Sequence, residues 1–255
     1  MSTLSDFFEK VANEIIEKKR NKSTEKDKFV APKFNTSKCE DQYVGLIRIE
    51  RLNARYCKWI KCSLKEKELR SDLHNELKEE KLPIFAIVLE SPHTDEYKTT
   101  VHNIPIPMPA IGDTGENIQD FLPKYINRMN ATCETDKISK GVGYIDIPSG
   151  IYRVLLVNAI QFQCSLGEKT ELYRTNVFKN MWKEEAVKKD FFSRIDIPDV
   201  KIILNSCTNG NKNSTIRKIV QNEIDKIKSN CIKLHSLHPS SWQKCLGIEP
   251  EGWDN

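Results

Sequence analysis

Short, uninterrupted apolar runs separated by polar stretches with helical spacing dominate the chain from Pro83 onward. Runs of this kind are typical of strands buried on both faces of a parallel sheet. We predict strands over 84–89, 154–157, 200–204 and 231–234, and helices over 115–129, 178–189 and 214–228. This alternation favours a three-layer α/β/α fold around a central, mainly parallel four-stranded sheet.

The chain before residue 81 has a different pattern. Apolar residues at helical spacing, behind a cap at Ser5-Asp6, predict an amphipathic helix over 4–20, and a Lys-rich linker follows. Residues 43–62 alternate apolar and basic side chains, which fits either a hairpin or a short helix. We therefore predict an N-terminal helical and basic extension over 1–80 and a separate α/β domain over 81–255.

Composition narrows the class of protein only slightly. The chain has 255 residues and 38% hydrophobic content, which suits one core with an appended segment. Its 40 Lys+Arg against 36 Asp+Glu permit a nucleic-acid partner without requiring one. Basic residues concentrate within 10–38 and 48–61, where they could contact phosphates or form a solvated surface. We expect a monomer.

Neither a membrane span nor a secretory signal pattern is present in the sequence, so we expect a cytoplasmic protein without membrane contact. The eight cysteines are scattered and are expected to be thiols rather than disulfides. Cys57 and Cys62 lack the tight C-x2-C spacing of metal sites. We therefore predict no metal and no cofactor.

Polar residues follow each of the four predicted strands, at the edge where open parallel sheets bind ligands. The first exit, 90–97, carries three carboxylates and His93. A carboxylate at this edge could orient or activate a water molecule. The second exit begins with Asn158, whose amide can pair with the donor and acceptor edge of a nucleic-acid base.

The third exit, 205–210, is small and polar, which suits backbone amides that face a phosphate or an oxyanion. The fourth places His235 and His238 on one loop. An imidazole there could donate to a base carbonyl and stabilise negative charge on a leaving base, although metal ligation by the pair is an alternative. Ordinary solvated turns and helix caps have similar compositions.

Taken in order, these segments resemble the uracil-DNA glycosylase superfamily, most closely its thermostable bacterial and archaeal branch, family 4. The resemblance covers about 83–242 and rests on four short motifs. They are Leu-Glu-Ser-Pro-His-Thr-Asp-Glu at 89–96, Ala-Ile-Gly-Asp-Thr-Gly-Glu-Asn-Ile at 110–118, Leu-Leu-Val-Asn at 155–158 and His-Pro-Ser at 238–240.

The resemblance implies a monofunctional DNA glycosylase that flips a modified or aberrant pyrimidine out of double-stranded DNA and hydrolyses its bond to the sugar. It assigns catalytic roles to Glu90, Glu96 and His238. Asn158 would read the pyrimidine edge. The base pocket would comprise Ser91, Pro92, His93, Ala110, Ile111 and Asn158, and phosphates would be held by Gly112, Thr114, Ser206, Ser240 and Ser241.

The chain departs from the family pattern at two places. Ala110 stands where an aromatic residue normally stacks on the flipped base, a contact of about 1–3 kcal/mol. Either His93, Tyr97 or His102 replaces that ring, or the base is bulkier than uracil. Glucosylated hydroxymethylcytosine, the target of glycosylases in bacterial phage defence, is such a base. Cys164 lacks the partner that a family cluster requires, since position 180 is Asn.

Three other functions fit the same residues. A housekeeping uracil-repair glycosylase would share every catalytic residue and differ only in pocket volume. A nucleic-acid-binding module that has lost hydrolysis would explain His93 at a position that is glycine in the family. An enzyme that cleaves free nucleosides could also use acids, Asn and His at strand ends.

Overall fold

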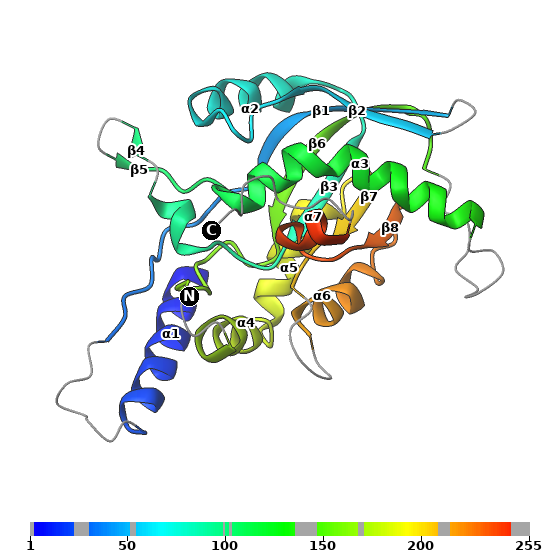
Figure 1. The fold of residues 1–255 in the computed structure, drawn as a ribbon. Helices are drawn as coiled ribbons and strands as arrows, with labels where there is room; N and C mark the ends of the chain where they lie inside the picture. The colour runs from blue at the N-terminus through cyan, green and yellow to red at the C-terminus, as the bar shows by residue number, and fades with distance from the viewer. Residues whose placement is uncertain are drawn as a thin grey trace, which may run out of the picture.

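A six-stranded sheet lies at the centre of the computed structural model (Figure 1), with strand order β2-β1-β6-β3-β7-β8. The structure describes residues 3–22, 31–51, 55–98, 100–101, 104–135, 147–167, 171–208 and 215–245. The strands are β1 (Gln42–Arg51), β2 (Arg55–Cys62), β3 (Ile84–Leu89), β6 (Gly150–Asn158), β7 (Val200–Asn205) and β8 (Ile232–His235).

The four predicted strands form the parallel part of this sheet, because β3 pairs in parallel with β6 and β7, and β7 with β8. The predicted number of strands is wrong. Strands β1 and β2 form an antiparallel hairpin, and β1 also pairs antiparallel with β6, giving a mixed sheet. In the hairpin, Ile47, Ile49 and Cys57 are buried, whereas Arg48 is partly exposed and Lys58 is exposed. Strands with one solvated face alternate and lack a continuous apolar run.

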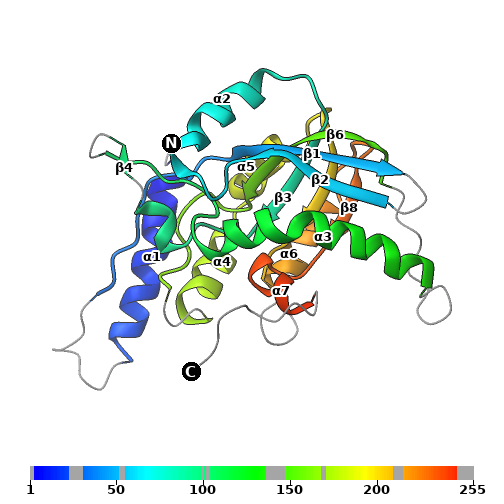
Figure 2. The same cartoon turned by 45° about the horizontal axis from the view of Figure 1, so that its top comes forward.

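Alternate side chains of β3 enter two separate apolar clusters. Ile84, Ala86 and Val88 pack with α1 (Leu4–Arg20), α4 (Asn176–Met181), α5 (Glu185–Ile195) and α6 (Ile216–Ile224). Phe85, Ile87 and Leu89 pack with α3 (Asp113–Thr135) and α7 (Trp242–Cys245) on the other face. Helix α3 runs along the sheet in Figure 2. The chain is therefore an α/β protein with helices on both faces of its sheet.

Helix α1 belongs to the same core as β3, β6 and β7. It is capped by Thr3 rather than by the predicted Ser5-Asp6, because the Thr3 hydroxyl accepts from the Asp6 backbone N–H and the Asp6 side chain accepts from Thr3. The Phe8 ring stacks on Phe162, with 5.1 Å between ring centroids. The segment 1–80 thus contributes one helix of the core and two strands of the sheet.

The following helix, α2 (Arg70–Glu79), comes after a 3-10 turn, η2 (Lys67–Leu69), and packs on β1. Its end is held by Arg153 of β6, whose guanidinium donates to the carbonyl oxygens of Leu77 and Leu82 at 3.0 and 2.8 Å. The contact is buried, so it joins α2 firmly to the sheet.

The predicted helix over 178–189 is two helices, α4 and α5, with a break at 182–184. Trp182 at this break packs against Phe178 and Phe191 with ring centroids 5.3 and 5.4 Å apart. The turn lets rings from both helices enter one cluster, which helical spacing alone does not reveal.

The remaining elements are η3 (Thr94–Tyr97), β4 (Thr100–Val101), β5 (Ile104–Pro105), the π-helical turn η5 (Glu171–Thr175) and η6 (Pro239–Ser241). Among the described helices, none is long and apolar enough to cross a membrane.

Replacing Phe8 with alanine should lower the free energy of unfolding by about 3–5 kcal/mol, because the ring is fully buried against Phe162. Urea denaturation followed by circular dichroism measures this loss. Glu9→Ala, on the exposed face of the same helix, should change stability by less than about 0.5 kcal/mol. Equal midpoints for the two variants would show that α1 is not part of the core.

Candidate functional site

The carboxylate of Glu90, the first residue after β3, is buried at the carboxyl edge of the sheet, with 5% of the residue exposed. Thr208, which follows β7, binds both of its oxygens. The backbone N–H of Thr208 donates to Oε2 at 3.0 Å, and its hydroxyl donates to Oε1 at 2.5 Å. Because β3 and β7 are parallel neighbours, their exits meet. The Thr208 amide, predicted to face a phosphate, binds this carboxylate.

Two cationic or titratable side chains flank the Glu90 carboxylate. The Arg174 Nη1 atom lies 3.4 Å from Oε1, and the His238 Nε2 atom lies 4.0 Å from Oε2. Burial raises the pKa of Glu90, but His238, Arg174 and the two hydrogen bonds from Thr208 outweigh burial and hold the pKa below its ordinary value. Glu90 is therefore a carboxylate at neutral pH.

His238 is oriented by its own loop. Its Nδ1 accepts from the backbone N–H of Ser240 at 3.4 Å and lies 2.9 Å from the Ser240 hydroxyl. With Nδ1 accepting, the proton of the neutral ring sits on Nε2, the nitrogen that faces Glu90. A separation of 4.0 Å is too long for a direct hydrogen bond, so Nε2 is free to donate to another acceptor.

Asn158 ends β6 and pairs with Leu89, the residue before Glu90. It is 1% exposed, yet neither the nitrogen nor the oxygen of its side-chain amide has a hydrogen-bond partner in the part of the chain that the structure describes. Its backbone carbonyl accepts from Arg194 at 3.0 Å, and the same guanidinium nitrogen contacts both oxygens of Asp41 at 2.8 Å. A buried amide without partners costs free energy and indicates a ligand that pairs with it.

Glu96, the second predicted acid, has a different environment. Both of its carboxylate oxygens accept from backbone N–H groups, one from His93 and one from Ala110. Its backbone carbonyl accepts from the N–H of Met108 at 3.0 Å. Burial raises the pKa of Glu96 to about 8, against the opposing effect of these two amides. Glu96 therefore joins the first exit to the loop 108–112.

Arg70 also contacts the loop 108–112. The sequence pattern does not indicate this residue. The residue is fully buried at the start of α2, and its Nη2 donates to the Pro109 carbonyl at 2.6 Å. Burial lowers its pKa to about 10, and Cys39 and Glu96 oppose this change when they are ionised. A pKa of about 10 keeps the guanidinium protonated at neutral pH. Ala110, next in the chain, has a left-handed φ of 53°, which these contacts on both sides hold in place.

The residues predicted to line the base pocket occupy several environments. Ser91 and Pro92 lie directly after Glu90. The methyl group of Ala110 is buried in the cluster beneath α3. Ile111, the next residue, is partly exposed. The His93 ring contacts Asp95 at 3.2 Å and lies against Gly167.

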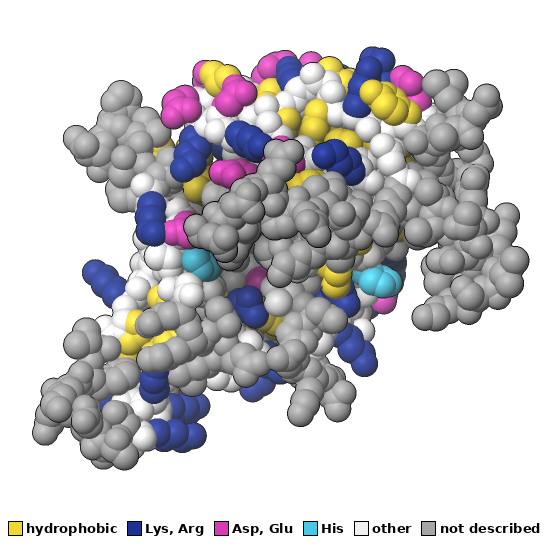
Figure 3. Space-filling model, in the orientation of Figure 1, with side chains coloured by type: hydrophobic (Ala, Val, Ile, Leu, Met, Phe, Trp, Pro, Cys, Tyr) yellow, Lys and Arg dark blue, Asp and Glu magenta, His cyan; other side chains and the backbone are white. Residues whose placement is uncertain are grey.

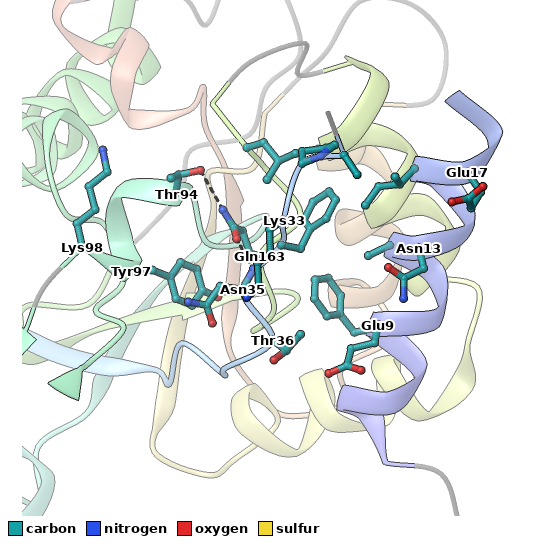
Figure 4. A pocket seen from close by; sticks show the side chains of 17 residues that line it. Glu9, Asn13, Glu17, Lys33, Asn35, Thr36, Thr94, Tyr97, Lys98 and Gln163 are labelled. Atoms are coloured by element: carbon teal, nitrogen blue, oxygen red, sulfur yellow. Dashed lines mark hydrogen bonds between the residues drawn. The ribbon is translucent and has the colours of Figure 1, made fainter. Parts of the chain in front are cut away.

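Tyr97, at the end of η3, lines a groove with α1 and Gln163 (Figure 4). Its hydroxyl donates to the Ser37 carbonyl at 3.2 Å. The ring is therefore committed to the α1 side of the molecule. His102, another candidate for base stacking, lies outside the described residues.

The predicted phosphate contacts divide into two groups. Gly112 and Thr114 are partly exposed at the start of α3, and Ser240 and Ser241 are accessible beside His238. Ser206, in contrast, is fully buried, and its hydroxyl bonds the Ser236 hydroxyl at 2.7 Å. Because β7 and β8 are parallel neighbours, these two serines meet and the Ser206 hydroxyl faces the interior.

The basic residues of the hairpin lie far from this site. Strand β1 runs antiparallel to β6, so Ile49 pairs with Gly150 at the start of β6, away from Asn158. On the face drawn in Figure 3, basic side chains occur at the far end of α1 and among acidic side chains over α2. The described cations on that face do not form one continuous patch. Within the described parts of the chain, no group of three or more His, Cys, Asp or Glu side chains could hold a metal ion.

Comparison of the chain with models of known protein families, with curated proteins and with solved structures gave no match. The family membership that the four motifs suggest therefore stays a prediction. Glu90, Asn158 and His238 follow or end strands that leave the sheet at the same edge, and their side chains determine the chemistry that the site can perform.

Protonation of Glu96 should stabilise the fold. Its pKa is raised from 4.5 to about 8, so its stabilising effect is fully present below about pH 4.5 and is lost as pH rises toward 8. Glu96→Gln cannot titrate, and its unfolding free energy should fall less than that of the wild type across this window. Chemical denaturation at a series of pH values measures the difference. The exposed-site variant Glu185→Gln should follow the wild type, and parallel curves for all three proteins would contradict the linkage.

Proposed function

We propose that this protein is a DNA glycosylase that hydrolyses the bond between a modified or aberrant pyrimidine and its deoxyribose in double-stranded DNA. One observation carries the proposal. An ionised, buried Glu90 lies beside the Nε2 atom of His238, and the next strand ends in Asn158, whose buried amide has no partner within the described segments. Together they offer an anion, a donor and an amide that can pair with a base.

Glu90 suits the sugar side of the reaction. When the bond between C1′ and the base nitrogen breaks, its electron pair leaves with the base and positive charge develops on the sugar. A carboxylate held in a water-poor site stabilises that charge. Glu90 also accepts a proton from the water molecule whose oxygen forms the new bond to C1′, and this requires the ionised form that Arg174 and Thr208 maintain.

His238 and Asn158 suit the base side. The Nε2–H group of His238 would donate to a base carbonyl, on which negative charge accumulates as the base departs. The two unpartnered atoms of the Asn158 amide match the adjacent donor and acceptor of a pyrimidine edge. The target nucleotide must leave the helix to reach these groups, as in other enzymes that act on bases.

The loop 108–112 favours a base larger than uracil. Its side chains include no aromatic ring, and the methyl group of Ala110 is buried in the cluster beneath α3. A substituted cytosine such as glucosylated hydroxymethylcytosine would use the space that a stacking ring otherwise fills. A cytosine glycosylase of this kind would act in defence against phages with modified DNA, whereas uracil excision would indicate housekeeping repair.

Duplexes that contain uracil, hydroxymethylcytosine or glucosylated hydroxymethylcytosine test the proposal. The wild type should produce alkali-labile abasic sites in at least one of them. Glu90→Gln should be slower by roughly 10²–10⁴-fold, because it removes the proton acceptor. Glu185→Gln, an exposed control, should retain activity.

Cleavage of none of the three duplexes by the wild type would contradict the proposal. DNA binding without cleavage would then indicate a binding module. Release of base from free nucleosides alone would indicate a nucleoside-cleaving enzyme.

Asn158→Ala should separate activity from stability. The wild-type amide makes no hydrogen bond to the described residues, so its removal should change the unfolding free energy by less than about 1 kcal/mol while abasic-site formation is lost. Asn205→Ala is the matched control at the end of β7, because its amide donates to the Arg217 carbonyl and to Gln221 at 3.0 and 2.9 Å. That variant should lose about 1–3 kcal/mol. Full activity of Asn158→Ala would remove this residue from the site.

A further inference from the structure

Arg174 belongs to no motif in the sequence, yet it reaches the most buried part of the candidate site. It lies in the π-helical turn η5, 84 residues from Glu90 in the chain. Only 18% of its side chain is exposed. A guanidinium is expensive to bury unless its donors are paired, so each of its nitrogen atoms requires an explanation.

One nitrogen atom is accounted for by Glu90 and Thr208. The Arg174 Nη1 atom lies 3.4 Å from Oε1 of Glu90 and 3.5 Å from the Thr208 hydroxyl oxygen. The Thr208 hydroxyl donates to the same Oε1 atom. This carboxylate oxygen is therefore held between an arginine from η5 and a threonine from the β7 exit, which restricts its position and favours its negative charge.

A second nitrogen atom is not accounted for. The Nε atom of Arg174 is buried and has no hydrogen-bond partner among the described residues. The neighbouring Asn158 amide, at the adjacent strand exit, is in the same condition. Unpaired buried donors are rare in folded proteins, and two such side chains at one edge of a sheet indicate that a bound molecule supplies the missing acceptors.

We propose that Arg174 holds Glu90 in its working position and charge state through Nη1 and binds an oxygen acceptor of the substrate nucleotide through Nε. This inference rests on the proposed glycosylase function. It makes Arg174 a residue that links substrate binding to the acid, because one planar group contacts both. The acceptor is an oxygen of the sugar-phosphate backbone or of a substituent on the base.

The charges around Glu90 predict how the site responds when Arg174 is replaced. His238, in its protonated form, and Arg174 are the two groups that lower the pKa of Glu90 by their charge. The other titratable groups near Glu90 are Glu96 and the thiols of Cys164 and Cys207, whose pKa values burial raises, so both thiols are neutral. Loss of the Arg174 charge leaves His238 and the two hydrogen bonds from Thr208 to oppose the effect of burial, and the pKa of Glu90 then rises.

Two substitutions separate the two roles of Arg174. Arg174→Gln removes the charge, so the acid limb of the kcat/KM profile should move to higher pH, since Glu90 becomes protonated earlier. Arg174→Lys keeps the charge without the Nε donor, so its acid limb should stay near that of the wild type while KM rises roughly three- to tenfold. Thermal denaturation of both variants establishes that they are folded.

A comparison of KM values for duplexes with and without a base substituent identifies the acceptor of the Arg174 Nε–H group. A rise in KM for Arg174→Lys that occurs only with hydroxymethylated or glucosylated duplexes assigns the acceptor to the base substituent. An equal rise with every cleaved duplex assigns it to the sugar-phosphate backbone. If the wild type is active, an acid limb that does not move in Arg174→Gln, or a KM that does not change in Arg174→Lys, would overturn the inference. An inactive wild type would instead refute the proposed function itself.

Discussion

Burial of the Glu90 charge is the constraint on which the candidate site depends. A carboxylate removed from water either finds partners or takes up a proton. Glu90 finds partners on three separate segments: Thr208 after β7, Arg174 in η5 and His238 after β8. Each partner is held in place by a different part of the fold. The positions of these loops are consequently coupled through one negative charge.

The second acid of the first exit acts on the backbone. Glu96 accepts from the amides of His93 and Ala110, and Arg70 binds the carbonyl between Met108 and Ala110. The pKa values of Glu90 and Glu96 are therefore moved in opposite directions by their surroundings. Separation of two acids in this way is a common basis for division of roles in hydrolases. Because Arg70 starts α2, the segment before residue 81 also shapes the site.

Much of this arrangement could be predicted from sequence, because the parallel strands are continuous apolar runs and Glu90 and Asn158 directly follow them. The sequence of the hairpin fits either two strands or a short helix, since strands with one exposed face carry basic residues that also suit a helix. Arg174 and Arg70 could not be predicted. Their stretches are polar, buried arginines are rare, and the contacts of Arg174 come from residues distant in the chain. The break between α4 and α5 likewise depends on ring packing.

The position of β6 in the sheet has a consequence for how the chain folds. This strand lies between β1 and β3, although both precede it in sequence. The N-terminal hairpin therefore has no partner in the sheet until residues 150–158 are available. Pairings over such long separations are slow to form, because loop closure must precede the gain from contacts. During synthesis, the edges of the hairpin and of β3 that pair with β6 would therefore stay unpaired until β6, from the middle of the chain, has been made.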